Sequence, residues 1–452
     1  MKLLRREPSR AIGVSPVGRA GACLLVLLAW LAAAPAVVAE DDDVTRYLGV
    51  KTCAGSTCHG AGGASDSRVL QNEFQTWHRQ DKHAKAYEVL AGERGQRIAR
   101  NLGLDSATSA PECLACHATY VPAEQRGKRF SLSDGVSCES CHGPASRWLG
   151  QHVAGEASRA ENIAKGMYPT EDPVKRAALC LSCHLGQGER FADHRLMGAG
   201  HPRLSFELDT FTRIQPAHFR VDADYRARKQ VAPGLRVWAV GQIAAARRFL
   251  DLFTSGKHPG NGAFPEFAFF DCHACHHAFT TPRWQPRASN PLPPGTPHLN
   301  DANLLMLSAL ASRLDEAVAG RLDDAVKNLH AASLLSLDAT LAAARTLDGV
   351  LAELERSVAG AALQAAEPAA VLRAVITRGR AGDYNDYAAA EQATMAVAAL
   401  VDALAEAGAI DAARREALAA KVAALYDATA KQDSWQPAVF DSALEALDAT
   451  LD

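Results

Sequence analysis

The chain has little excess charge, few long apolar stretches and little methionine. Its 48 Lys and Arg residues nearly balance 51 Asp and Glu residues, for a formal net charge of −3. This balance argues against nucleic acid or an anionic membrane as the partner. No apolar run beyond the first 39 residues suggests a membrane span. At 452 residues, the chain is expected to form a globular protein of two or three domains.

The first 39 residues have the pattern of a secretion signal. Basic residues run up to Arg19, and an apolar stretch follows from Ala22 to Ala39. Val37 and Ala39 are the small residues that a signal peptidase requires before a cut at Glu40. The alternative is a membrane anchor that is kept. We expect cleavage and a periplasmic location, with no membrane span left afterwards.

Cysteine and histidine occur in a fixed order. Of eleven cysteines, Cys23 leaves with the signal, and the other ten form five pairs, each followed directly by histidine. Four pairs have the spacing C-x-x-C-H, and the first is longer, C-x-x-x-x-C-H. The motifs are Cys53/Cys58-His59, Cys113/Cys116-His117, Cys138/Cys141-His142, Cys180/Cys183-His184 and Cys272/Cys275-His276.

This order is the attachment signal for c-type haem. Two thiols add to the two vinyl groups of one porphyrin, and the adjacent histidine supplies the proximal nitrogen to iron. Five disulfides or zinc sites would leave the histidine after every second cysteine unexplained. We therefore expect five covalently bound haem c groups, or four if the Cys53/Cys58 site holds only a disulfide.

Composition divides the mature chain. Residues 40–285 carry every motif and have poor hydrophobic periodicity, as expected where porphyrins form the core. Residues 286–299 are a proline-rich connector, and 300–452 are rich in alanine and leucine without cysteine. The expected fold is mainly α: a haem-packed domain with little regular secondary structure, then a helical bundle of about six helices. Helices are predicted around 74–90 and 231–254 and after Asp383 or Asn385, and Asp411 is expected to cap the helix that follows.

The motif region resembles the cytochrome c-554-like multihaem cytochromes, relatives of the electron acceptors of hydroxylamine oxidoreductase. The stretches carrying this resemblance include TCAGSTCHGA, FQTWHRQDKHAKAY, DGVSCESCHGPASRWLGQH, DHRLMGAGHPRLSFEL and FAFFDCHACHH. The resemblance implies a mostly helical fold organised by stacked haems, with histidine on both faces of most irons. The chain departs from four-haem members in its motif count and its long C-terminal region.

Eleven histidines remain as possible distal ligands. The resemblance places one at His83, and His152, His194 and His201 lie in comparable stretches, so these four are the predicted distal ligands. Four methionines besides the initiator make Met ligation less favoured than histidine pairs. We rank the remaining histidines below these four: His78, His218, His258, His273, His277, His298 and His330.

Two functions compete. Irons with two histidines have no open position and would transfer electrons between redox proteins, either cytochromes or a membrane quinol-linked complex. The alternative is an oxidoreductase acting on a small nitrogen or sulfur compound at one open-site haem. No lysine replaces the motif histidine, which argues against a C-x-x-C-K nitrite reductase. We favour the electron carrier and predict no catalytic residue. Candidates for the alternative pocket are His194, Arg195, Arg203, Tyr120 and Tyr168. The C-terminal helices could pair two protomers.

Overall fold

The computed structural model describes residues 44–66, 69–155, 157–256, 266–277, 287, 289–290, 292–360, 363 and 367–451. The predicted signal sequence and His258 lie outside these residues. The description below concerns the unit formed by residues 46–452. The fold is mainly α, as predicted, with β1 (Gly186–Gln187) and β2 (Arg190–Phe191) as two short antiparallel strands.

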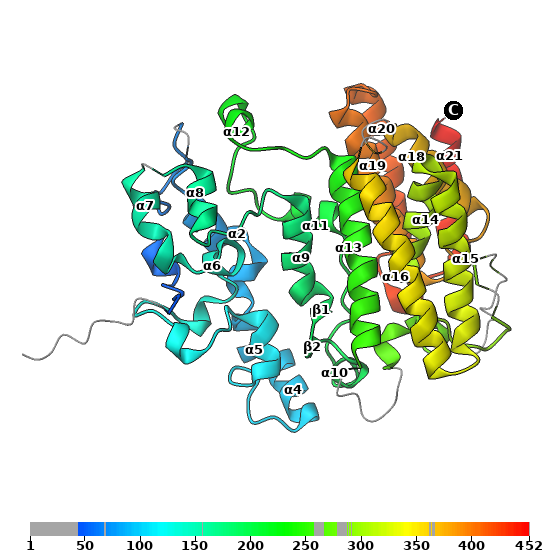
Figure 1. Cartoon of the computed structure of the whole chain (residues 1–452), viewed down its shortest axis with the longest axis horizontal. Helices are drawn as coiled ribbons and strands as arrows, with labels where there is room; N and C mark the ends of the chain where they lie inside the picture. The colour runs from blue at the N-terminus through cyan, green and yellow to red at the C-terminus, as the bar shows by residue number, and fades with distance from the viewer. Residues whose placement is uncertain are drawn as a thin grey trace, which may run out of the picture. The chain divides into compact units, whose positions relative to one another are not determined.

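Short helices joined by turns make up the part that carries the first four motifs (Figure 1). The α-helices are α2 (Glu73–Gln80), α3 (Glu88–Ala91), α4 (Glu93–Leu102), α5 (Pro111–His117), α6 (Cys138–His142), α7 (Leu149–Ala154), α8 (Arg159–Ala164), α9 (Pro173–His184), α10 (His194–Gly198), α11 (Leu208–Ile214) and α12 (Ala223–Arg228). The 3₁₀ turns are η1 (Val50–Thr52), η2 (Lys82–Lys85), η3 (Ala123–Gln125), η4 (Leu132–Asp134) and η5 (Ala145–Arg147).

The helix predicted over 74–90 is interrupted at Asp81. Asp81 has an extended backbone and accepts a hydrogen bond from the His83 backbone N–H, which ends α2 and begins η2. Aspartate favours such a cap because its short side chain competes with the helical hydrogen bonds. The interruption places His83 in η2 rather than in α2.

Longer helices form the bundle. They are α13 (Gly234–Ser255), α14 (Ala302–Leu314), α15 (Glu316–Ser333), α16 (Leu337–Ala359), α18 (Pro368–Arg380), α19 (Tyr387–Glu406), α20 (Ala412–Ala428) and α21 (Pro437–Leu451), with η6 (Phe267–Phe269), η7 (Cys272–Ala274) and η8 (Gln432–Ser434) as 3₁₀ turns. Seven described α-helices therefore follow residue 300, against about six predicted. The cap of α19 is Asp386, one residue from Asn385, and α20 begins after its predicted cap, Asp411.

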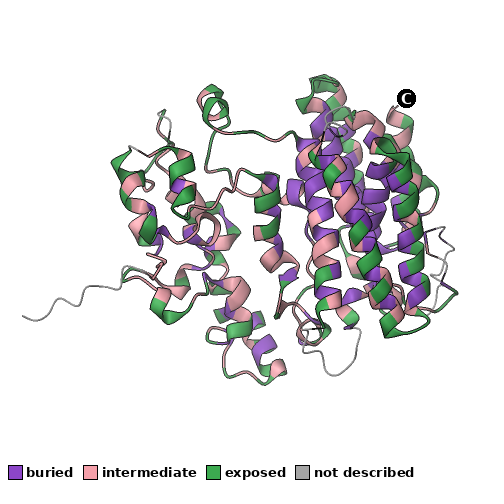
Figure 2. Cartoon of the chain, viewed as in Figure 1, coloured by how far each residue is buried: buried purple, intermediate pink, exposed green. Residues whose placement is uncertain are grey.

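The largest apolar core lies in this bundle, as the buried residues in Figure 2 show. Helix α13 comes before the proline-rich connector, yet it packs on α14, α16 and α19 (Figure 1). Its fully buried Trp238 and Ile243 belong to the same core as Leu400 of α19. One core therefore joins residues from both sides of the connector. The domain boundaries proposed from the sequence remain a prediction.

The motif-bearing part has a much smaller core of its own. Five buried residues form it: Leu90, Ala99, Ala107, Leu114 and Ala118. Most of the surrounding residues are half-buried or exposed in Figure 2. Side chains alone bury little apolar surface here, which is what a region built around large planar cofactors requires.

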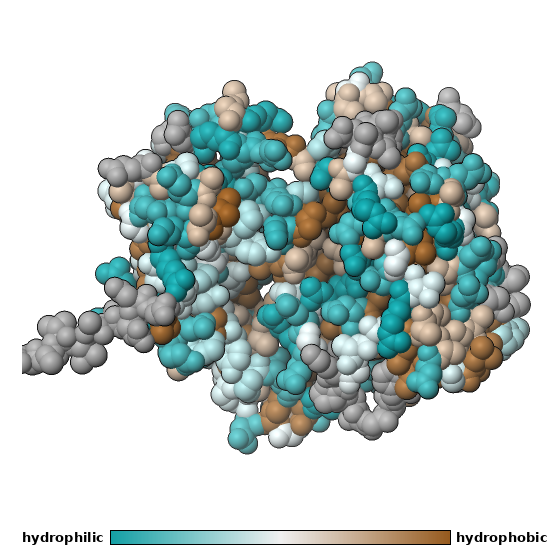
Figure 3. All heavy atoms as spheres, in the orientation of Figure 1, coloured by the Kyte–Doolittle hydropathy of each residue, from teal (hydrophilic) through white to brown (hydrophobic). Residues whose placement is uncertain are grey.

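Helix α19 is the one described helix long and apolar enough to cross a membrane. Within its most apolar window, 78% of the residues are buried inside the protein. Figure 3 shows hydrophilic residues spread among apolar ones over the visible face of the surrounding helices. Helix α19 is thus the central helix of the bundle.

Candidate functional site

Every motif histidine lies opposite a second histidine. The five pairs have ring centroids between 6.1 and 6.4 Å apart. We number the pairs as sites 1 to 5 in the chain order of their motifs. Site 1 is His59 with His152, site 2 is His117 with His201, site 3 is His142 with His218, site 4 is His184 with His83, and site 5 is His276 with His194.

This separation fits two imidazoles on opposite sides of one metal ion. A metal–nitrogen bond of about 2.0 Å, with the ring centre about 1.1 Å behind the nitrogen, places trans imidazole centroids about 6.2 Å apart. Contacting aromatic rings in general span about 4.5 to 7 Å between centroids. The signal is therefore that each of the five motif histidines has one histidine partner at nearly the same separation, the one that two ligands of a single iron would have.

Helix geometry positions the motif histidines. In α5, α6 and α9 the motif forms the last turn, so that both cysteines and the histidine project from one end of a helix. Pro111 and Pro173 at the helix starts favour these short elements, since proline fits the first helical position. The first motif, with its longer spacing, lies in turns after η1, and the fifth begins in η7.

The ten motif cysteines are all described and all free. Cys53 hydrogen-bonds to Cys138 of the third motif, which lowers the pKa of the Cys53 thiol. A hydrogen bond from Cys116 of the second motif lowers the pKa of Cys183 in the fourth to about 6. The disulfide alternative would join Cys53 to Cys58 instead. The thiol contacts place motif 1 beside motif 3 and motif 2 beside motif 4.

Burial keeps several of the paired imidazoles neutral. It lowers the pKa of His142 and of His184 to about 4, and it also lowers the pKa of His201. Metals bind the neutral imidazole, so these side chains are in the binding form at pH 7. At two other imidazoles a carboxylate acts in the opposite direction, because hydrogen bonds from His59 to Glu73 and from His83 to Asp81 raise the pKa values of both histidines.

All four predicted distal histidines lie opposite a motif histidine. The fifth partner is His218, which the sequence ranked below those four. It lies between α11 and α12 in the stretch QPAHFR, which carries no motif and no recognisable helix pattern. The number of histidines indicates that such a partner is needed. Five motif histidines require five partners, and only four were predicted, so the fifth has to be one of the seven lower-ranked histidines.

The pocket residues of the alternative function make separate contacts. Arg195 pairs with Glu112 at 2.8 Å, and Arg203 pairs with Glu391 of α19 at 2.6 Å. The Tyr168 hydroxyl donates to the Lys175 carbonyl, 2.8 Å away. A surface hollow beside Arg195 is lined otherwise by Asn101, Leu102, Gly198 and Ala199, which offer no acid or base. Arg195, Arg203 and Tyr168 therefore each contact a different partner.

Site 5 is attached to the bundle. His273, inside the fifth motif, is buried and lies 5.7 Å from the Tyr387 ring and 5.5 Å from the Trp435 ring, between centroids. Its Nε2 is 3.1 Å from the Gln432 carbonyl oxygen. Tyr387 begins α19, whereas Gln432 and Trp435 lie in the turn before α21. The C-terminal helices thus support the fifth motif.

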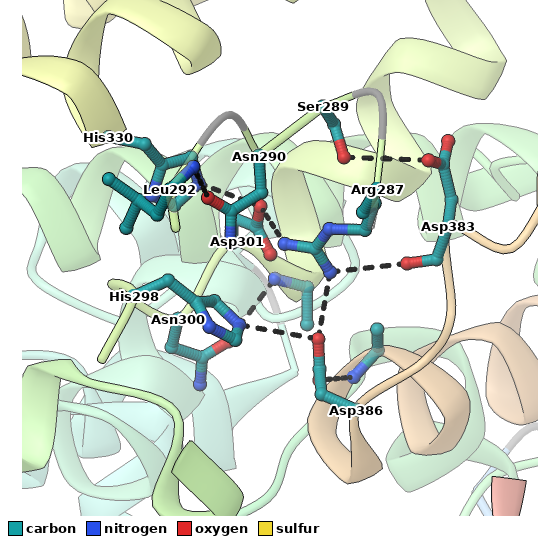
Figure 4. Close-up of polar contacts among 12 residues, drawn as sticks. Arg287, Ser289, Asn290, Leu292, His298, Asn300, Asp301, His330, Asp383 and Asp386 are labelled. Atoms are coloured by element: carbon teal, nitrogen blue, oxygen red, sulfur yellow. Dashed lines mark hydrogen bonds and ion pairs between the residues drawn. The ribbon is translucent and has the colours of Figure 1, made fainter. Parts of the chain in front are cut away.

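A buried ionic cluster strengthens this attachment (Figure 4). Arg287 donates to Asp301 at 2.7 Å and to Asp386 at 2.8 Å, and His330 lies 2.9 Å from Asp301. Just outside the cluster, the Asp271 N–H donates to the His298 carbonyl at 2.9 Å, which links the residue before Cys272 to the cluster.

The same cluster contains a group with metal-ligand geometry. Ligand atoms of His298, Asp301 and Asp386 lie within 4.8 Å of one another. The guanidinium of Arg287 already donates to both carboxylates (Figure 4). A metal ion would have to displace that buried cation, so we assign the cluster a structural role.

Comparisons with known proteins agree with this geometry. Residues 52–143 match the family model described as cytochrome c554 and c-prime. Cytochrome c-554 of Nitrosomonas europaea is 28% identical over 152 residues, which are 31% of this chain and 57% of that protein. The chain thus spans little more than half the length of this curated relative. No solved structure matches the chain. Residues 52–143, which carry the first three motifs, are accordingly similar to the c-type cytochromes of the cytochrome c-554 kind.

Proposed function

We propose that the chain is a periplasmic pentahaem cytochrome that transfers electrons between redox proteins. The observation that carries the proposal is the set of five histidine pairs, each 6.1 to 6.4 Å apart between ring centroids. The ten motif cysteines would hold five haem c groups by thioether bonds. Each bound haem supplies an iron that alternates between the ferric and ferrous states.

Two histidines at every iron favour electron transfer over substrate chemistry. An enzyme needs an open coordination position with acids or bases around it. His152, His201, His218, His83 and His194 would each close the position opposite a motif histidine. The paired histidines would also hold each iron in nearly the same geometry in both oxidation states, which favours rapid electron exchange.

The spatial order of the sites suggests a path. The thiol contacts join motif 1 to motif 3 and motif 2 to motif 4. Burial raises the pKa of Cys141 in motif 3 to about 12, and the charge of the nearby Cys180 in motif 4 adds to the effect. His194 begins α10 and His201 follows its end, which links sites 5 and 2. We infer the order of sites 1, 3, 4, 2 and 5, which differs from their order in the chain.

Both ends of this path are open to solvent. Cys58 and His152 at site 1 are exposed, and so are Cys275 and His276 at site 5. A redox partner needs only a small, transient interface to exchange electrons with an exposed haem edge. We propose that electrons enter at one of these two ends and leave at the other.

Charge distribution is consistent with many bound haems. Residues 44–299 contain 31 Lys and Arg against 23 Asp and Glu, whereas residues 300–452 contain 12 against 23. Each haem brings two propionates, and cationic side chains stabilise such carboxylates. The basic excess therefore lies in the part of the chain where ten propionates would be placed.

Mass spectrometry and EPR together test the proposal. The intact periplasmic protein should have the mass of residues 40–452 plus five haems, and Cys53→Ala/Cys58→Ala should have one haem fewer. The ferric protein should give only low-spin signals, and the ferrous protein should bind little carbon monoxide. A wild-type high-spin signal with strong carbon monoxide binding would instead support the open-site oxidoreductase, and fractionation to the cytoplasm would contradict export.

A further inference from the structure

The paired histidines differ in what holds their second ring nitrogen. Nδ1 of His83 is 2.9 Å from Oδ1 of Asp81, and Nδ1 of His59 is 3.0 Å from Oε2 of Glu73. At site 2, by contrast, both contacts are to backbone carbonyl oxygens. His117 Nδ1 is 2.8 Å from the Ala86 oxygen, and His201 Nδ1 is 2.8 Å from the Pro202 oxygen. A full negative charge thus faces one imidazole at site 4 and one at site 1.

Asp81 is held in place from several directions. Its side chain is 6% exposed, and Oδ1 also accepts from the His83 backbone N–H at 2.9 Å. Oδ2 accepts from Nε2 of Gln215, again at 2.9 Å. Because both oxygens are engaged, the carboxylate cannot rotate away from the imidazole without losing two other hydrogen bonds. The contact with His83 is therefore a built feature of the fold.

Gln215 connects this carboxylate to the neighbouring site. It lies three residues before His218, the partner of His142 at site 3. Within the described residues, no ring-nitrogen hydrogen bond is found for His142 or His218. Site 3 thus offers an internal comparison, with two imidazoles that have no described carboxylate contact beside a site that carries a carboxylate-bonded one.

We propose that Asp81 and Glu73 are positioning residues that lower the reduction potentials of sites 4 and 1 relative to site 3. This inference rests on the proposed haem ligation. A carboxylate that accepts the Nδ1–H gives the imidazole partial imidazolate character, and its Nε2 becomes a stronger donor to iron. A stronger donor stabilises the ferric state over the ferrous state, which lowers the potential. One electron reduces the iron, and the Nδ1 proton stays between the two residues throughout.

The potentials would then alternate along the inferred order of sites. Sites 1 and 4 would be the low-potential members, with site 3 between them at a higher potential. Electrons would therefore rest preferentially on site 3 rather than on sites 1 and 4 in a partly reduced molecule. Asp81 and Glu73 would set this distribution without touching the iron.

Asp81→Asn tests the proposal with little change of shape. The carboxamide oxygen can still accept from His83, and its NH₂ group can donate to the amide oxygen of Gln215, so the fold should hold. We expect one of the five reduction potentials to rise by about 59 mV. For a one-electron couple, this rise corresponds to a tenfold shift of the equilibrium toward the reduced state. Glu73→Gln should raise a different single potential. Asp81→Glu keeps the negative charge, so its reduction potentials should differ less from those of the wild type than the potentials of Asp81→Asn do.

The control is Glu88→Gln. Glu88 is an exposed carboxylate that pairs with Lys85 at 3.2 Å and has no recorded contact with a histidine ring. Its replacement removes the same charge and should leave all five potentials close to those of the wild type. Potentials are measured by EPR-monitored redox titration, with haem content checked by intact mass.

The outcomes separate this inference from the proposed function. Five low-spin haems with unchanged potentials in Asp81→Asn and Glu73→Gln would overturn the inference and leave the function standing. Equal shifts in Glu88→Gln and Asp81→Asn would also overturn it, because they would show a general charge effect. If His83→Ala produced no high-spin haem, the ligation itself would be wrong, and the function would fail with it.

Discussion

His142 and His218 face each other with ring centroids 6.2 Å apart and ring planes at 89°. The first ends helix α6 and the second lies in an irregular stretch before α12. Burial lowers the pKa of His142 to about 4, and the charge of His218 is the next largest influence. Two imidazoles from distant parts of the chain thus face each other, and burial keeps that of His142 neutral.

Replacement of His218 tests the fifth distal ligand. His218→Ala should convert one low-spin haem to high-spin and should let one ferrous haem bind carbon monoxide, because the iron opposite His142 loses a ligand. EPR and carbon monoxide difference spectra measure both effects. His78→Ala is the matched control, since the exposed His78 stacks on Phe74 and faces no motif histidine. Equal spectra for the two variants would remove His218 from site 3.

The contact of Trp435 with His273 predicts a local effect on site 5. Trp435→Ala should destabilise the protein by about 3–5 kcal/mol, as expected for a large buried aromatic side chain, and should also shift the EPR signal of one haem. Phe440→Ala removes another fully buried ring of the bundle that has no recorded contact with His273. It should cause a similar loss of stability and leave the haem signals alone. A signal shift in both variants would indicate a global effect.

The buried ionic cluster predicts a large cost for a small change. Asp301→Asn leaves the Arg287 cation without one of its two buried carboxylate partners and should lower the unfolding free energy by about 3–5 kcal/mol. Glu353→Gln removes the exposed ion pair with Arg321 and should cost at most about 1 kcal/mol. Denaturant unfolding of both variants gives the comparison. Similar small losses would mean that the cluster is not stabilising the attachment of the connector.

Glu207 predicts a dependence of stability on pH. Burial raises the pKa of this carboxyl to about 7, above its ordinary value of 4.5. The native state therefore keeps a proton that the unfolded chain releases, so stability falls as pH rises from about 4.5 to 7, by up to about 3 kcal/mol. Glu207→Gln should lack this pH-dependent component. The difference in unfolding free energy between variant and wild type should therefore favour the variant more at pH 8 than at pH 5.

Denaturant unfolding at the two pH values measures the difference. The amide oxygen of the introduced glutamine can still accept from the Asp209 and Thr210 backbone N–H groups that Glu207 caps. Asp411→Asn changes the exposed cap of α20 in the same way and should not alter the pH difference. An unchanged pH dependence in Glu207→Gln would show that this carboxyl is ionised in the native protein.

The sequence by itself determined the covalent chemistry and the helical class. C-x-x-C-H is a local pattern, because both thiols and the proximal histidine must lie on one turn of chain, so spacing alone indicates it. The cap of α20 at Asp411 and the start of α13 near Val231 can also be predicted from the sequence, because helix caps and periodicity depend on residues only a few positions apart.

Only the tertiary structure decided how the histidines pair, that His218 is the fifth partner, and which carboxylates contact the paired rings. A distal histidine approaches from anywhere in the chain, so His218 carries no local signal, and Asp81 is recognised as the partner of the His83 ring only once the chain bends at η2. The place of α13 in the C-terminal bundle was likewise hidden, because composition changes at the connector while the apolar face of α13 finds its partners beyond it. Residue spacing determines local geometry, whereas contacts between side chains far apart in the sequence depend on how the whole chain buries its apolar surface.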